Sequence, residues 1–282
     1  MHELSFVLSD KTIAALSNGN TEKPLLVALH GWLDNAASFI PVSEFFEDYN
    51  VVAIDMIGHG KSSHRDPQAH YNLVDYLQDL YQLCQHQGWQ SFFLVGHSLG
   101  GIVSSMFAAA FPEHVKKLVC IETAGPLTEP ESTTVAQLRN SIVSRHQSLI
   151  STIKQPQSFT HIVRSRCKVS DLSAHNAELL LHRNTQVDDT TSTLMWRTDK
   201  RLRTLSSVRL TELQTQDLIS HICCPCKIIL GTHGFAKVSV NLDKRRAWFK
   251  YLSVDIIPGG HHVHMESCEQ LASSICSFLE RN

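Results

Sequence analysis

Ser98 is the residue of this sequence best placed to act as a nucleophile. It lies in the segment GHSLGG (residues 96–101), which follows the apolar run Phe92–Val95 and leads into the apolar stretch Ile102–Ala110. This order predicts a strand, a tight turn and a buried helix, with the serine at the apex of the turn. The flanking glycines allow strand and helix to approach closely, because a Cβ atom would clash there. The serine hydroxyl would then stand at the N-terminus of a helix, where free N–H groups stabilise a developing negative charge.

His261 is the predicted base for this serine, because a serine hydroxyl needs a partner that removes its proton. It lies in the segment PGGHHVHME (residues 258–266), directly after two glycines, between a predicted strand and the C-terminal helix. Loops at the carboxyl ends of parallel strands build the sites of open α/β sheets. His262 and His264 in the same segment are interpreted as neighbours of the base or as surface groups.

Glu122 is the predicted acid that orients the histidine. It ends the apolar strand Lys117–Ile121, which is the next strand along the chain after that of the serine. A charged residue at the end of an apolar strand needs a partner, and here its carboxylate would point toward the serine. The alternative interpretation is a carboxylate that only caps the following loop. If Glu122 is not the acid, Asp199 and Asp243 are the other candidates.

Two backbone N–H groups are candidates for an oxyanion hole. One belongs to Trp32, which follows the predicted strand Leu25–Leu29, and the other belongs to Leu99, next to the serine. Such a donor typically contributes about 2.7–4 kcal/mol to transition-state stabilisation. The segment DMIGHGKS (residues 55–62) lacks the spacing of a phosphate-binding loop. We interpret it as a structural turn in which Asp55 accepts hydrogen bonds from the backbone.

Short apolar runs alternate with helical patterns through most of the chain. The apolar runs predict strands at residues 25–29, 51–55, 92–95, 117–121, 227–230 and 253–257. Helical periodicity predicts helices over residues 71–86 and 100–111, and a C-terminal helix that presents Leu271, Ala272, Ile275, Phe278 and Leu279 on one face. This alternation predicts an α/β fold, with a mostly parallel twisted sheet covered by helices on both faces. The more polar runs Leu4–Leu8 and Thr12–Leu16 predict an antiparallel hairpin at the sheet edge.

The alternation stops after Pro126 and resumes near residue 218. Between residues 128 and 217 we predict no buried strand, only helical segments with many Arg, Ser and Thr residues. The predicted organisation is therefore a core of residues 1–127 and 218–282, with an inserted helical cap of residues 128–217 over the strand ends. The arginines of the cap are compatible with an acidic or polar acyl substrate, although surface arginines are common and count for little.

Composition limits the classes of function. The 282 residues are 43% hydrophobic, enough for one large core, and a formal net charge of −2 gives no basic field for nucleic acid or an anionic membrane. No apolar run approaches the roughly 20 residues of a membrane span, and the first residues, MHELS, do not resemble a signal peptide. We therefore expect a cytoplasmic protein whose eight cysteines are reduced thiols. The cluster Cys223, Cys224 and Cys226 has no second pair at metal-binding spacing, so no metal is expected.

These motifs together resemble those of the α/β-hydrolase superfamily, and the segment HGWLDNAASF (residues 30–39) resembles its serine hydrolase-like group. Further matches lie at residues 55–62, 96–101, 196–199 and 260–261, so the resemblance spans nearly the whole chain. It implies a Ser–acid–His triad beneath a helical lid, with Ser98 as nucleophile and His261 as base. It also implies hydrolysis of carboxylic esters or related acyl compounds without a cofactor.

One departure from the superfamily pattern concerns the acid. An aspartate commonly follows the strand that corresponds to residues 227–230, where this chain has Thr232-His233-Gly234. In relatives such as some haloalkane dehalogenases, a glutamate at the end of the strand after the nucleophile is the acid, and Glu122 resembles that arrangement. Haloalkane and epoxide chemistry is not expected, because those relatives carry an aspartate where Ser98 stands.

The sequence therefore predicts a serine hydrolase that cleaves a small carboxylic ester, or a related acyl compound, through an acyl-enzyme intermediate. One alternative is a C–C bond hydrolase of ring-fission products, although the glycine-rich oxyanion loop and later aspartate usual in that group are absent here. Another is a small-molecule receptor on a hydrolase scaffold with slow or no turnover. The expected partner is a small-molecule substrate, and nothing in the sequence indicates its identity or an oligomeric state.

Overall fold

Eight strands of the computed structural model, which describes residues 1–281, form one sheet. They are β1 (His2–Val7), β2 (Thr12–Ser17), β3 (Leu25–Leu29), β4 (Asn50–Ile54), β5 (Phe92–His97), β6 (Val115–Ile121), β9 (Cys226–Gly231) and β10 (Leu252–Ile257). Their order across the sheet is β1-β2-β4-β3-β5-β6-β9-β10. Only the β1–β2 and β2–β4 pairs are antiparallel. The predicted mostly parallel sheet and its antiparallel edge hairpin are therefore confirmed.

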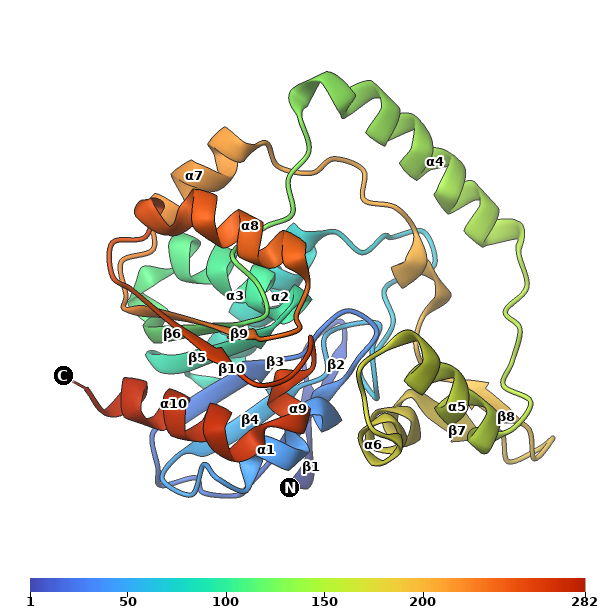
Figure 1. The fold of residues 1–282 in the computed structure, drawn as a ribbon. Coiled ribbons are helices and arrows are strands. Elements are labelled where there is room, and N and C mark those ends of the chain that lie inside the picture. Colours follow the sequence, from blue (N-terminus) through green and yellow to red (C-terminus); the bar gives the residue numbers. More distant parts are fainter. Residues whose placement is uncertain (282) are drawn as a thin grey trace.

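Helices cover both faces of this sheet, as predicted (Figure 1). One face carries α2 (Leu73–Gln87), α3 (Leu99–Ala110), α7 (Glu212–Ser220) and α8 (Ala236–Arg245). The opposite face carries α1 (Ile40–Ser43), α9 (Val263–Glu266) and α10 (Cys268–Glu280). Short 3₁₀ helices lie at residues Ala36–Phe39, Pro112–His114, Glu131–Thr133, Lys200–Arg203 and Arg246–Trp248.

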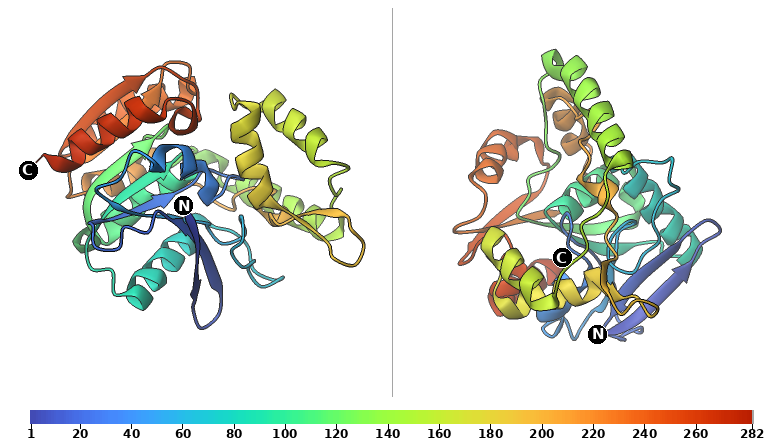
Figure 2. Two further views of the ribbon diagram at one scale, coloured as in Figure 1. Left: turned by 90° about the horizontal axis from the view of Figure 1, so that it is seen from below. Right: turned by 90° about the vertical axis from the view of Figure 1, so that its right-hand side faces the viewer.

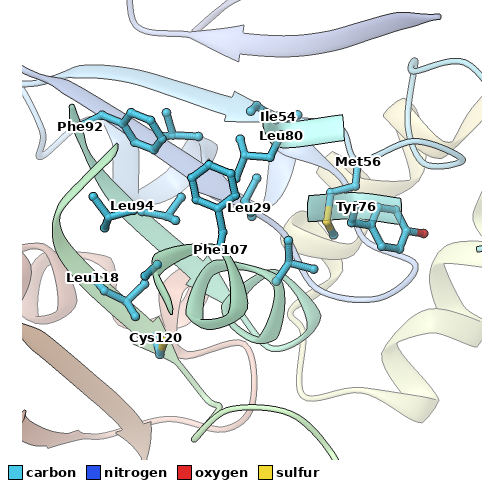
Figure 3. Close-up of a cluster of buried hydrophobic side chains, with 14 of the residues drawn as sticks. Leu29, Ile54, Met56, Tyr76, Leu80, Phe92, Leu94, Phe107, Leu118 and Cys120 are labelled. Carbon is cyan, nitrogen blue, oxygen red and sulfur yellow. The ribbon is translucent and has the colours of Figure 1, made fainter. Parts of the chain in front are cut away.

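The hydrophobic core has one part on each face of the sheet. Side chains of a strand point alternately to the two faces, so Leu94 of β5 joins one cluster while Val95 joins the other. In the first cluster, Phe107 of α3 is fully buried among strand residues and packs near Leu80 of α2 (Figure 3). In the second, Ile275 of α10 is fully buried against the sheet. Burial of such a side chain contributes about 1.5–3 kcal/mol, so the two clusters fix the sheet between its helix layers.

The strand register brings the predicted functional segments to one edge of the sheet. Leu29 of β3 lies beside Gly96 of β5, and His97 of β5 lies beside Ile121 of β6. The pairing continues from β6 to β9 and from β9 to β10. The residues that follow β3, β5, β6, β9 and β10 therefore emerge side by side at the carboxyl edge.

Residues 128–217, the predicted cap, contain helices and one short two-stranded sheet of their own. Its elements are α4 (Thr134–Ile150), α5 (Phe159–Val169), α6 (Ala174–Asn184), β7 (Thr185–Val187), β8 (Leu194–Trp196) and most of α7. The antiparallel β7–β8 hairpin was not predicted, since three-residue strands that are partly exposed show neither an apolar run nor an alternation. Figure 1 and the right-hand view of Figure 2 show α4 standing away from the sheet, whereas α5 and α6 lie closer to it.

No helix within residues 1–281 is both long enough and apolar enough to cross a membrane.

Candidate active site

Ser98 occupies a strained turn between β5 and α3. Its backbone has φ 50° and ψ −114°, a conformation that non-glycine residues rarely adopt, and its N–H donates to the carbonyl of Ile121 at 2.9 Å. The turn needs its glycines: a Cβ at Gly100 would overlap the carbonyl oxygen of Leu29, and one at Gly96 would overlap the backbone of Gly100. The predicted strand–turn–helix is thus present, with the serine at the N-terminus of a 12-residue helix.

The structure brings His261 and Glu122 together at this edge. His261 Nδ1 lies 3.1 Å from Glu122 Oε2, and the glutamate side chain is 1% exposed. Because a carboxylate accepts hydrogen bonds, Nδ1 of the neutral imidazole carries the proton and Nε2 is left as the acceptor. Within residues 1–281 no hydrogen bond occupies Nε2, and none joins it to the Ser98 hydroxyl, so the nitrogen is available to take up a proton.

The loop after β9 holds Glu122 and does not supply a carboxylate itself. The N–H groups of Gly231 and Phe235 donate to the two oxygens of Glu122, at 2.7 and 3.3 Å. A Cβ at Gly234 would overlap the Glu122 carboxylate, so a side chain there would displace it. The Phe235 ring also stacks on the His261 imidazole, with centroids 4.1 Å apart.

The two other acid candidates lie away from His261. Asp199 hydrogen-bonds to Arg201 and to the hydroxyl of Tyr71, and Asp243 is exposed on α8. Neither carboxylate contacts the histidine within the part of the chain that the structure describes.

His97, the residue before the serine, tethers the backbone of His261. Its Nε2 lies 2.9 Å from the His261 carbonyl oxygen, to which it must donate, since a carbonyl oxygen only accepts. Burial and the surrounding histidines lower the pKa of His97 well below its usual value, so the ring stays neutral. This contact links the loop of the base directly to the elbow of the nucleophile.

Both predicted oxyanion donors have free N–H groups. The backbone N–H groups of Trp32 and Leu99 have no hydrogen-bond acceptor among residues 1–281. They follow neighbouring parallel strands, β3 and β5, so both emerge at the edge that holds the serine. Asp55 accepts from the N–H groups of Ala36 and Lys61, as expected of a structural turn, and also binds Arg183.

A partly buried ionic cluster lies beside His261, and the sequence did not reveal it. His262 Nδ1 is 2.5 Å from Asp171, and its Nε2 is 3.4 Å from Asp34, which also binds Arg166 at 2.6 Å. Burial disfavours the charge of His262, but the hydrogen bonds to Asp171 and Asp34 outweigh it and raise its pKa to about 9. The same contacts hold the pKa of Asp34 and of Asp171 below the usual range, despite burial. The two carboxylates, the arginine and the histidine therefore stabilise one another in their charged forms.

The cluster connects the predicted cap to the core. Arg166 and Asp171 come from α5 and the segment after it, whereas Asp34 follows β3 and His262 follows the predicted base. His262 and His264 are both buried, at 6% and 0% exposed, so they are neighbours of the base and not surface groups. Burial lowers the pKa of His264 to about 3, which leaves it neutral.

No group of three or more His, Cys, Asp or Glu side chains among residues 1–281 is arranged to hold a metal ion. Of the clustered cysteines, Cys224 and Cys226 are buried and Cys223 is exposed, and all eight thiols are free.

Comparisons with known proteins concern the family and the fold. A family model described as alpha/beta hydrolase fold matches residues 24–267. The human protein named serine hydrolase-like protein 2 is 31% identical, over 99% of this chain and 94% of its own length. A crystal structure of a hypothetical protein from Pseudomonas aeruginosa PAO1 superposes with a TM-score of 0.91 at 29% identity, covering all of both chains. The thioesterase domain from the curacin biosynthetic pathway superposes with a TM-score of 0.85 at 26% identity, covering 98% of this chain and 99% of that one.

Proposed function

The chain belongs to the α/β-hydrolase superfamily, in its serine hydrolase-like group, and we propose that it cleaves a carboxylic ester or a related acyl compound with a Ser98–His261–Glu122 triad. The observation that carries this proposal is the pairing of His261 with buried Glu122 at the sheet edge that holds the elbow serine. A histidine oriented in this way has the tautomer that a serine nucleophile requires.

The proposed reaction has two steps. In the first, Ser98 Oγ attacks the carbonyl carbon while its proton passes to His261 Nε2, and the carbonyl oxygen becomes an anion that the N–H groups of Trp32 and Leu99 bind. The tetrahedral intermediate then breaks its bond to the leaving group, which takes the proton from His261. In the second step, water gives a proton to His261 and attacks the acyl-enzyme, and the carboxylic acid leaves as Ser98 regains its proton.

Glu122 and His97 would keep the base in place during both steps. Glu122 stabilises the imidazolium that forms when His261 takes up the proton, and His97 holds the backbone of the loop. Because the solved neighbour at 26% identity is a thioesterase domain, thioesters fall within the related acyl compounds of this proposal.

Labelling with a fluorophosphonate, read by intact-protein mass, tests the proposal. We expect one adduct in the wild-type protein and none in Ser98→Ala, together with hydrolysis of short p-nitrophenyl esters that the substitution abolishes. Labelling or hydrolysis that survives in Ser98→Ala would show that another residue is the nucleophile. Stoichiometric acylation without release of the acid would favour the receptor alternative.

A further inference from the structure

A cavity of about 940 Å³ lies between the predicted cap and the loop after β3. Its walls come from α4, α5, α6, β8 and the 3₁₀ helix Lys200–Arg203, together with Trp32 and Leu33 of the core. Ser98, Glu122 and His261 do not line it. Trp32 does, and its backbone N–H is the proposed oxyanion donor, so this residue belongs both to the cavity wall and to the proposed oxyanion hole.

The charges around this cavity are unbalanced. Four cationic side chains line it, Lys154, Arg166, Lys200 and Arg203, against a single carboxylate, Asp199. That carboxylate is already engaged: it accepts hydrogen bonds from the side chain and N–H of Arg201. It also accepts from the hydroxyl of Tyr71. Asp199 therefore has little capacity left to neutralise the cavity.

Three of the four cations have no carboxylate partner among residues 1–281. Arg166 is paired with Asp34, whereas Lys200 donates only to the carbonyl oxygen of Ser151, at 2.7 Å. Arg203 makes no hydrogen bond in that part of the chain, and its guanidinium lies 6.0 Å from the centre of the Trp32 ring. Arg203 is exposed to solvent and has no carboxylate partner in that part of the chain, so its guanidinium is free to bind an anion in the cavity.

The remaining lining is divided between apolar and hydroxyl side chains. The apolar part is formed by Leu33, Ile153, Ile162, Val169, Leu180 and Leu181. Hydroxyl side chains include Ser144, Ser148, Ser151 and Thr204. A ligand that complements this wall has an apolar chain and an anionic end.

We propose that this cavity binds the anionic end of the substrate, a carboxylate or a phosphate on an apolar chain, and that Arg203 is its main contact. Lys154 and Lys200 supply further positive charge, and the stem of the substrate runs past Trp32 to Ser98. The inference rests on the proposed serine-hydrolase chemistry and adds the substrate class, anionic acyl esters or thioesters.

A pair of matched esters tests this class. p-Nitrophenyl hydrogen suberate carries a free carboxylate, and its methyl ester is the neutral counterpart of nearly equal size. We expect wild-type kcat/KM to favour the anionic ester by about tenfold or more, mainly through KM, and 1 M salt to reduce that preference. Equal or better use of the neutral ester would overturn the inference while leaving the proposed hydrolase function intact.

Substitutions assign the preference to Arg203. Arg203→Gln should reduce the ratio between the two esters to near one, and Arg203→Lys should restore part of it. The matched control is Arg209→Gln, which removes an arginine that pairs with Glu129 and does not line the cavity. If Arg209→Gln lowers the ratio as much as Arg203→Gln, the preference reflects overall charge and the assignment to the cavity is wrong.

A binding measurement keeps the inference testable without turnover. Octanoate, octyl phosphate and octanol are added to the Ser98→Ala protein and to Ser98→Ala/Arg203→Gln, and the Tm is recorded. We expect octanoate or octyl phosphate, but not octanol, to raise the Tm of Ser98→Ala and to leave that of Ser98→Ala/Arg203→Gln unchanged. The anion that raises the Tm identifies the anionic group of the substrate as a carboxylate or a phosphate. No rise with either anion would overturn the inference, even if the serine proves reactive.

Discussion

The proposed role of Glu122 as the acid of the triad can be tested by a substitution that changes only one group of its side chain. Glu122→Gln keeps the size of the side chain but replaces a carboxylate oxygen with an amide group, so His261 loses both its preferred tautomer and the charge that stabilises its protonated form. We expect kcat for a p-nitrophenyl ester to fall by about two to four orders of magnitude with the fold unchanged.

Asp243→Asn is the matched control for this substitution. Asp243 is exposed on α8 and was an alternative acid in the sequence, so its amide variant should retain wild-type kcat. A Glu122→Gln enzyme within a few fold of wild type would show that Glu122 is not the triad acid.

The residues of the proposed triad could be predicted from sequence because each follows an apolar strand in a recognisable local context. Glycines mark the turns of Ser98 and His261, and Glu122 is a lone charge at a strand end. Arg166 and Asp171 could not be predicted, since they contact partners 132 and 91 residues away and lie in no motif. Arg203 also shows no local pattern, because its significance lies in the absence of a nearby carboxylate in three dimensions.

At the level of elements, the cluster around His262 fastens α5 to the core. The free energy that this histidine contributes depends on pH. Its pKa is raised from 6.5 to about 9, so the contribution is complete below pH 6.5 and is lost as the pH rises through about 9. The groups that face it are Asp34 and Asp171, which stay ionised in this range, Arg166, the neutral rings of His97 and His264, and the ring of His261.

We therefore expect the free energy of unfolding of the wild-type protein to decline by at most about 3 kcal/mol between about pH 6.5 and pH 9, and the Tm to fall with it. His262→Gln should be less stable at pH 7 and should lack most of this decline. His146→Gln, which removes an exposed histidine of α4, is the control. A decline of equal size in His262→Gln and wild type would contradict the assignment of the titration to His262.

The helices of the predicted cap differ in how firmly they are packed. α6 buries Leu180 at 1% exposure, whereas α4 buries only Ser141 and leaves Leu149 64% exposed. Leu180→Ala should therefore reduce the free energy of unfolding by about 2–5 kcal/mol, and Leu149→Ala should change it by less than about 0.5 kcal/mol. Urea unfolding of both variants measures the difference, and similar losses would mean that α4 packs more tightly than its exposure indicates.

The strands of the sheet were predicted to within two residues at each end, since long apolar runs leave little choice of structure. The β7–β8 hairpin was missed because its six strand residues include only one that is buried, Thr185. The local sequence pattern does not predict the structure of a segment whose conformation depends on contacts with residues distant in the sequence. Asn184, for example, is fixed by its hydrogen bond to the carbonyl of Leu33 and not by its neighbours in the sequence.

At the scale of the whole molecule, the parallel sheet explains why residues so far apart in sequence form one site. Every parallel strand from β3 to β10 ends at the same edge, and each of the segments after β3, β5, β6, β9 and β10 contributes a group to the site described above. The global fold could be predicted because it needs only the order of strands and helices. The shape and charge of the cavity could not, because they depend on how α4, α5 and the 3₁₀ helix pack together.

The position of Glu122, the proposed acid, at the end of β6 has a consequence during synthesis of the chain on the ribosome. Ser98 and Glu122 leave the ribosome early, and His261 follows 139 residues after the glutamate, which takes roughly 7–28 s at usual rates of synthesis. During that time a nascent chain carries the proposed nucleophile and acid but not the proposed base. The proposed triad is complete only after β10 and the segment that follows it have joined the sheet, so we expect fragments released before that point to have no hydrolytic activity.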